Sequence, residues 1–235
     1  MKEKISIALD VSSRQEALRL VKDLRDLAGM FKVGSQLYMA TGPTIVREII
    51  DAGGKVFLDL KFHDIPNTVT HAAVEAALLG VSMMTIHASG GRAMMEATAT
   101  AVRDRFGDQK PIIVAVTVLT SLYKPGLSEV GVGDELHDQV VRLALLADDC
   151  GIDGVVCSPH EIRLVRSVVN RNFKVVVPGI RLADQSLHDQ QRAATPRDAI
   201  SAGADYIVVG RAVTADPDPR AAMERVAASI SVGTT

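Results

Sequence analysis

The stretch KVFLDLK, residues 55–61, is a short, mainly apolar run that includes two charged residues, Asp59 and Lys61, near its end. Apolar residues that follow one another, instead of alternating strictly with polar ones, are typical of a strand buried on both faces of a parallel sheet. Similar runs lie at residues 5–10, 30–34, 83–88, 112–119, 154–158, 174–179 and 206–211. Together these runs predict eight buried strands.

Segments with helical periodicity lie between these runs. Apolar side chains fall along one helical face in residues 15–27, 136–150 and 217–230. Helix starts are expected at Ser12-Ser13, Asp134 and Pro196. Strands that alternate with helices predict a parallel sheet, which could be an open doubly wound sheet or a closed barrel. The strand count and the length of 235 residues favour a closed (β/α)8 TIM barrel, an α/β fold, as a single domain over residues 1–235.

The composition is that of a globular chain with balanced charge. Hydrophobic residues make up 47% of it, and 26 Lys and Arg stand against 28 Asp and Glu, for a net charge of −2. This balance gives no reason to expect nucleic acid or a membrane as partner, but it allows a small anionic ligand. Cys150 and Cys157 form no C-x-x-C pair, and no apolar stretch is typical of a signal peptide or a membrane span. A cytoplasmic protein with free thiols is expected.

Charged residues lie at the ends of the first three predicted strands. Asp10 closes the first, Lys32 lies within the second, and Asp59 and Lys61 close the third. Because side chains alternate across a strand, Asp59 and Lys61 are expected on one face. Burying such groups is costly unless they are paired, so Lys32, Asp59 and Lys61 are expected to pair with one another.

These charges allow two other interpretations. An inert ion-pair plug at the top of the barrel would satisfy the same pairing. A metal site formed by Asp59, His63 and Asp64 is disfavoured, because Lys32 and Lys61 would repel a dication there. His87, at the end of the fourth predicted strand, is expected to be a rim histidine.

An anion site is expected at the ends of the last two strands. Strand seven ends in Pro178-Gly179-Ile180-Arg181 and strand eight in Val209-Gly210-Arg211. Barrels often bind phosphate there, because glycine lets backbone N–H groups approach the anion and arginine pairs with it. Two long segments, residues 120–133 and 181–195, are expected to be rim loops, the second of them a lid over the site.

The run DLKFHDIPNT, residues 59–68, resembles the signature of the orotidine 5'-monophosphate decarboxylase family. Further matching stretches are ALD at 8–10, FKVG at 31–34, VTVLTS at 116–121, PGIR at 178–181 and VGR at 209–211. The resemblance extends over essentially the whole chain. It implies decarboxylation of orotidine 5'-monophosphate to UMP and CO2, the last step of de novo UMP biosynthesis, without metal or organic cofactor.

The resemblance also implies a role for each residue of the charged set. Lys61 protonates C6 of the pyrimidine, and Asp59 lies beside the departing carboxylate. Lys32 orients the charges and contacts the ribose hydroxyls, and Asp10 binds a ribose hydroxyl. Thr120 reads the pyrimidine edge.

For the phosphate, the resemblance implies Arg181, Gln190, Gly210 and Arg211 as ligands. Gln191 is an alternative to Gln190, which is favoured by its distance from Thr195-Pro196. The family is a homodimer with shared sites, so Asp64, with Ile65 and Thr68, is expected to complete the site of the neighbouring subunit.

Two alternatives come from different classes of protein. Related sugar-phosphate barrels share the Asp-x-Lys pattern and the phosphate residues, but they use Mg²⁺ and lack the continuation over residues 62–68. A non-catalytic binder of phosphate ligands would keep Gly210 and Arg211 but would not need the charged set.

Overall fold

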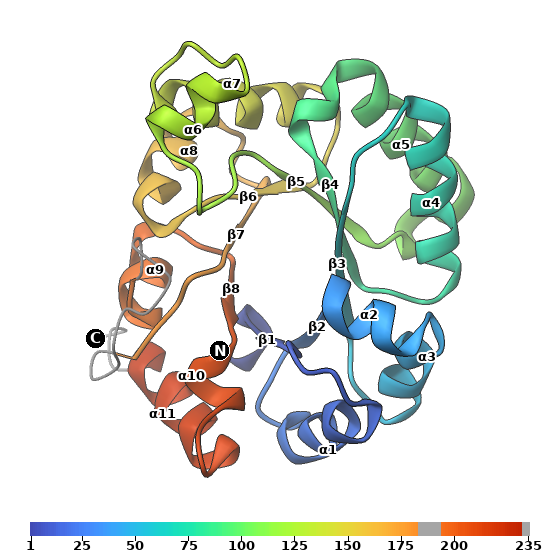
Figure 1. Ribbon diagram of the computed structural model, residues 1–235, viewed down its shortest axis with the longest axis vertical. Helices are drawn as coiled ribbons and strands as arrows, with labels where there is room; N and C mark the ends of the chain where they lie inside the picture. The colour runs from blue at the N-terminus through green and yellow to red at the C-terminus, as the bar shows by residue number, and fades with distance from the viewer. Residues whose placement is uncertain (183–193, 232–235) are drawn as a thin grey trace.

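Eight parallel strands close into a barrel, in a computed structural model that describes residues 1–182 and 194–231 (Figure 1). Each strand pairs with the next, and β8 pairs with β1. The strands are β1 (Ile5–Ala8), β2 (Met30–Gly34), β3 (Val56–Phe62), β4 (Met83–His87), β5 (Ile112–Val116), β6 (Gly154–Val156), β7 (Lys174–Val177) and β8 (Tyr206–Val209). The prediction of a closed (β/α)8 barrel is confirmed.

Helices surround the ring of strands (Figure 1). They are α1 (Arg14–Leu24), α2 (Ser35–Thr41), α3 (Thr44–Asp51), α4 (Pro66–Leu78), α5 (Gly91–Phe106), α6 (Lys124–Glu129), α7 (Leu136–Asp149), α8 (Ile162–Val168), α9 (Pro196–Ala202), α10 (Arg211–Thr214) and α11 (Pro219–Ser231). Short 3-10 turns lie at Lys2–Lys4, Ala88–Gly90, Gly107–Gln109 and Pro159–Glu161. Within the described ranges, no helix is long and apolar enough to cross a membrane.

Several boundaries differ from the sequence-based expectation. Most strands end earlier than expected, because the last residues of each run already turn into the rim loops; β1, for example, ends at Ala8 and not at residue 10. The expected loop at 120–133 contains the short helix α6, which has a proline in its first turn. The last helix begins at Pro219, two residues later than expected.

The expected helix starts are confirmed at two places and wrong at one. Ser13 caps α1, and the Thr195 hydroxyl accepts a hydrogen bond from the Asp198 N–H (3.1 Å) at the start of α9, where Pro196 is the first helical residue. Asp134 does not cap α7. That helix begins at Leu136, so its N-cap position is Glu135 and not Asp134. Asp134 instead forms an ion pair with Arg142.

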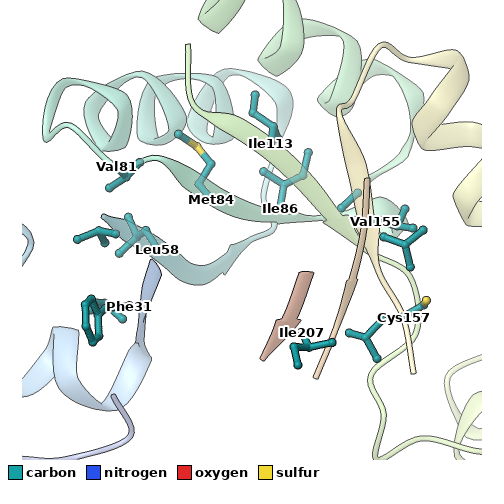
Figure 2. Close-up of a cluster of buried hydrophobic side chains, with 14 of the residues drawn as sticks. Phe31, Leu58, Val81, Met84, Ile86, Ile113, Val155, Cys157 and Ile207 are labelled. Carbon is teal, nitrogen blue, oxygen red and sulfur yellow. The ribbon is translucent and has the colours of Figure 1, made fainter. Parts of the chain in front are cut away.

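The apolar residues form two layers that the strands separate. The larger cluster lies between the strands and the helices and includes Phe31, Leu58 and Ile86 (Figure 2). The smaller cluster comes almost wholly from alternate strand positions and fills the barrel; it consists of Ala8, Met30, Phe57, Met83, Val114, Val176 and Val208. Because side chains alternate along a strand, the residues two positions further on also face the interior, nearer its carboxyl end. Those positions include Asp10, Lys32 and Asp59.

Candidate active site

A cavity of about 510 Å³ opens above the inner apolar cluster, at the carboxyl ends of the strands. Its lining includes eight of the predicted site residues: Asp10, Lys32, Asp59, Lys61, Thr120, Arg181, Gly210 and Arg211. The end of the barrel is the usual place for chemistry in this fold, because the loops there can vary without disturbing the strands. The structure therefore brings together charged residues from β1, β2 and β3 with glycine and arginine from the β7 and β8 ends.

The charged residues form an alternating array. The Lys32 Nζ lies 3.3 Å from Asp10 Oδ1 and 3.5 Å from Asp59 Oδ2, and the Lys61 Nζ lies 2.8 Å from Asp59 Oδ1. The Lys32 and Asp59 side chains are 12% and 13% exposed, whereas that of Lys61 is 37% exposed. The expected pairing is present, but the array opens onto a cavity. An inert plug would instead be enclosed by the barrel.

Two lysines keep the carboxylate of Asp59 ionised. Burial by itself would raise the pKa of this carboxyl group, but the charges of Lys32 and Lys61 and hydrogen bonds from Lys61 and Thr85 outweigh it and hold the pKa below its usual value. Asp59 is therefore an anion at neutral pH.

Lys61 has an unusual backbone conformation. Its φ is +53°, in the left-handed region that non-glycine residues rarely adopt, and no other non-glycine residue in the described ranges has a positive φ. The strand pairing is irregular here. Leu58 pairs with Met84 and the next paired residue, Phe62, pairs with Ile86, so β3 has four residues where β4 has two. The pairing of Lys61 with Asp59 was expected from strand alternation, whereas the bulge and the positive φ at Lys61 were not.

The opposite side of the cavity carries the expected anion-binding groups. Gly179 has a φ of +78°, which glycine adopts without strain, and Gly210 precedes Arg211 at the start of α10. Ile180 and Ala194 form a bridge, in which the Arg181 N–H donates to the Ala194 carbonyl at 3.0 Å. The two ends of the expected lid are thus held together. Gln190 and its alternative Gln191 lie outside the described residues.

Three predicted residues do not line this cavity. Asp64, Ile65 and Thr68 are exposed at the start of α4, where the Asp64 Oδ1 accepts a hydrogen bond from the Ile65 N–H (2.6 Å). Their side chains are available to a second molecule and not to the cavity of their own chain.

Two contributors to the site were missed by sequence reasoning. Gln36, in the first turn of α2, lines the cavity, and its Nε2 donates to Ser12 Oγ at 2.7 Å. Thr85, on β4, is fully buried and hydrogen-bonds to both Lys61 and Asp59. The position of Gln36, two residues after the end of β2, could have indicated a rim residue. Nothing in the sequence distinguishes Thr85 from an ordinary strand threonine.

Histidines lie beside the cavity but do not line it. The rings of His63 and His87 are 5.2 Å apart, and burial together with the nearby charges of His63 and Lys61 lowers the pKa of His87. His87 is therefore neutral at pH 7. Across the described ranges, no group of three or more His, Cys, Asp or Glu side chains is arranged to hold a metal ion. At Asp59 itself, the two adjacent ammonium groups oppose a dication.

Comparison with known proteins agrees with this geometry. The sequence profile described as "Orotidine 5'-phosphate decarboxylase / HUMPS family" matches residues 3–226. The chain belongs to this family. The resemblance noted in residues 59–68 is thereby confirmed.

Family members with a curated name are similar over nearly the whole chain. An orotidine 5'-phosphate decarboxylase of Syntrophotalea carbinolica is 50% identical over 96% of this chain and 93% of its own length. An orotidine 5'-phosphate decarboxylase of Moorella thermoacetica is 49% identical over 98% of this chain and 93% of its own length. The crystal structure of orotidine 5'-phosphate decarboxylase from Lactobacillus acidophilus superposes with a TM-score of 0.85 at 33% identity, covering 97% of this chain and 98% of that one.

Proposed function

We propose that this protein decarboxylates orotidine 5'-monophosphate to UMP and CO2. The observation that carries the proposal is the Asp10–Lys32–Asp59–Lys61 array, which opens onto a cavity with Arg181 and Arg211 in its lining. Relatives about half identical to this chain bear the name of that enzyme. Membership of the family and the geometry of the site therefore support the same reaction.

The array supplies what this reaction needs. Breaking the bond between C6 and the carboxylate releases CO2 and leaves the electron pair at C6, in the plane of the ring, where the π system cannot delocalise it. Preorganised charge is then the main means of stabilisation. In the proposed mechanism the Lys61 ammonium faces C6 and donates its proton there, and water later restores the proton. Asp59, whose Oδ1 lies 2.8 Å from the Lys61 Nζ, is placed beside the departing carboxylate.

The remaining residues are proposed to hold the rest of the nucleotide. Asp10 and Lys32 would bind the ribose hydroxyls, and Thr120 the pyrimidine edge. Arg211, Arg181, Gly210 and Gln190 would bind the phosphate. Binding energy at the phosphate can lower the barrier at a distant carbon if it helps to close and orient the site. The segment after Arg181 is proposed as a lid; its residues 183–193 lie outside the described ranges.

We further propose a homodimer in which Asp64, Ile65 and Thr68 complete the partner's site. Ile65 is 65% exposed and Met39 on α2 is 81% exposed, although both are large apolar side chains. Contact with a second subunit would remove both side chains from water. Asp64 is exposed and does not line its own cavity, which is also consistent with a role in trans.

A cytoplasmic location is proposed as well. Cys150 and Cys157 are both free thiols. Free thiols are usual where the compartment is reducing, which supports the proposal.

The loss of absorbance as orotidine 5'-monophosphate becomes UMP tests the reaction. We expect turnover with EDTA present, and a loss of kcat of several orders of magnitude in Lys61→Ala, because the proton donor and its charge are removed. Lys22→Ala, an exposed lysine on α1, is the matched control and should keep wild-type kcat. UMP binding without turnover in the wild type would contradict the proposal in favour of a binder. Turnover of a sugar phosphate only with Mg²⁺ would favour the related sugar-phosphate barrels.

A further inference from the structure

Thr85 makes two hydrogen bonds with the catalytic lysine–aspartate pair. Its side chain is fully buried on β4. The hydroxyl accepts a hydrogen bond from the Lys61 backbone N–H at 2.8 Å and donates one to Asp59 Oδ1 at 3.1 Å. Thr85 does not line the cavity, so it has no access to a substrate there. One hydroxyl group thus connects the backbone of one member of the pair with the carboxylate of the other.

The Lys61 backbone needs such a partner. In the bulged stretch of β3, opposite Thr85, the regular pairing of β3 with β4 is interrupted. The Lys61 N–H therefore donates to a side-chain oxygen of β4. A positive φ at a non-glycine residue is unfavourable, and such a conformation persists only where neighbouring groups hold it. The Thr85 hydroxyl is a fixed acceptor at the required point.

The carboxylate of Asp59 is held by the same hydroxyl. Asp59 Oδ1 accepts from both Lys61 Nζ (2.8 Å) and Thr85 Oγ1 (3.1 Å), while Oδ2 lies near Lys32. With partners on both oxygens, the carboxylate has little freedom to rotate. Its orientation in turn determines the direction of the Lys61 ammonium.

We propose that Thr85 is a positioning residue, which holds Lys61 in its left-handed conformation and aligns Asp59 so that the ammonium faces the substrate. This inference rests on the proposed function for its kinetic test. It assigns to β4 a role in the reaction that does not depend on contact with the substrate.

Kinetics of Thr85→Val, which keeps the shape of the side chain and removes the hydroxyl, test the inference. We expect kcat to fall about tenfold to hundredfold, since small misplacements of a reacting group have effects of that size. Affinity for UMP should change by less than about threefold, because the cavity lining is intact. Thr85→Ser keeps the hydroxyl and should restore most of kcat. If Thr85 only stabilised the fold, Thr85→Val would not lower kcat while leaving the affinity for UMP nearly unchanged.

Thr98→Val is the matched control. Thr98 is also fully buried, and its hydroxyl donates to the Met94 carbonyl (2.8 Å) within α5, away from the cavity. It should lose stability but keep wild-type kcat. An unchanged kcat in Thr85→Val, or an equal loss in Thr98→Val, would overturn the inference. If Thr85→Val does not fold, the comparison of Thr85→Ala with Thr85→Ser replaces it. Equal kcat values for these two variants would overturn the inference.

A crystal structure of Thr85→Val, or of Thr85→Ala, provides a test that does not depend on the reaction. We expect Lys61 to leave its φ of +53° or its Nζ to move from the 2.8 Å contact with Asp59. Retention of both would overturn the inference. If the wild type does not turn over orotidine 5'-monophosphate, the proposed function fails, and this structure alone decides the role of Thr85.

Discussion

Asp59 is the residue on which the site depends most. It lies between two lysines, and its carboxylate is largely buried. Removing one member of a buried charge cluster leaves its partners uncompensated, which is usually more costly than the cluster was favourable. The same arrangement links the stability of the protein to pH.

For Asp59→Asn we expect a loss of stability that depends on pH. Because the pKa of Asp59 in the folded protein lies below the ordinary value of 3.8, its carboxylate stabilises the fold above that pH, and this contribution is lost as pH falls through the folded pKa. The variant should be less stable than the wild type by on the order of 2 kcal/mol at pH 7, and the difference should shrink below pH 4.

Urea denaturation of both proteins between pH 3 and pH 7 measures this difference. Asp108→Asn, on the exposed turn at Gly107–Gln109, removes one carboxylate without a buried partner and is the control. A difference that stays constant, or that grows toward low pH, would contradict the expected linkage.

At the scale of elements, the rim of the barrel is organised by how strands end and helices begin. β3 ends in a bulge that sets the direction of Lys61. After β7, the bridge between Ile180 and Ala194 leads directly to the capped start of α9. The cap therefore stabilises a helix and also one end of the segment proposed as a lid.

Thr195→Ala tests the cap of α9. Thr195 Oγ1 accepts from the Asp198 N–H (3.1 Å) and donates to Asp198 Oδ2 (2.7 Å), so both partners lose a hydrogen bond in the variant. We expect a loss of about 1 kcal/mol in the free energy of unfolding, measured by urea denaturation, with Thr195→Ser close to the wild type. An unchanged stability in Thr195→Ala would show that the cap contributes nothing.

At the scale of the whole molecule, closure of the barrel joins the two ends of the chain. β8 pairs with β1, and Arg220 on α11 forms an ion pair with Asp26, after α1, at 2.6 Å. Closure also brings Gly210 beside Asp10: a Cβ built on the glycine would lie 3.7 Å from Asp10 Oδ2. The proposed ribose and phosphate ends of the site are adjacent because the barrel is closed.

Mixing two inactive variants tests whether the site is shared between subunits. Lys61→Ala removes the proposed proton donor of its own site, and under the proposed sharing Asp64→Ala disables the partner's site. Random exchange of subunits then forms mixed dimers with one intact site, so activity should recover to about one quarter of the wild type. Sedimentation should give the mass of a dimer. If Asp64 acts within its own chain, or if the protein is a monomer, mixing would restore no activity.

The sequence by itself determined the architecture and most of the charged lining of the cavity. Eight buried runs predicted the strands, because continuous apolar residues have no stable alternative to burial on both faces. The positions of Asp10, Lys32, Asp59 and Lys61 predicted the charged array, since alternation along parallel strands places such residues at one end of the barrel. Eight of the predicted residues line the cavity.

Only the tertiary structure decided what depends on register and on contacts between distant segments. The bulge that gives Lys61 a positive φ arises from the pairing of β3 with β4, and the role of Thr85 exists only because that bulge lies opposite it. The helix within residues 120–133 and the start of α7 after Glu135 were likewise not predicted. A hydrophobic pattern is local, so it can be recognised in a sequence. The hydrogen-bond partner of a buried hydroxyl depends on tertiary contacts between segments that are distant in the sequence.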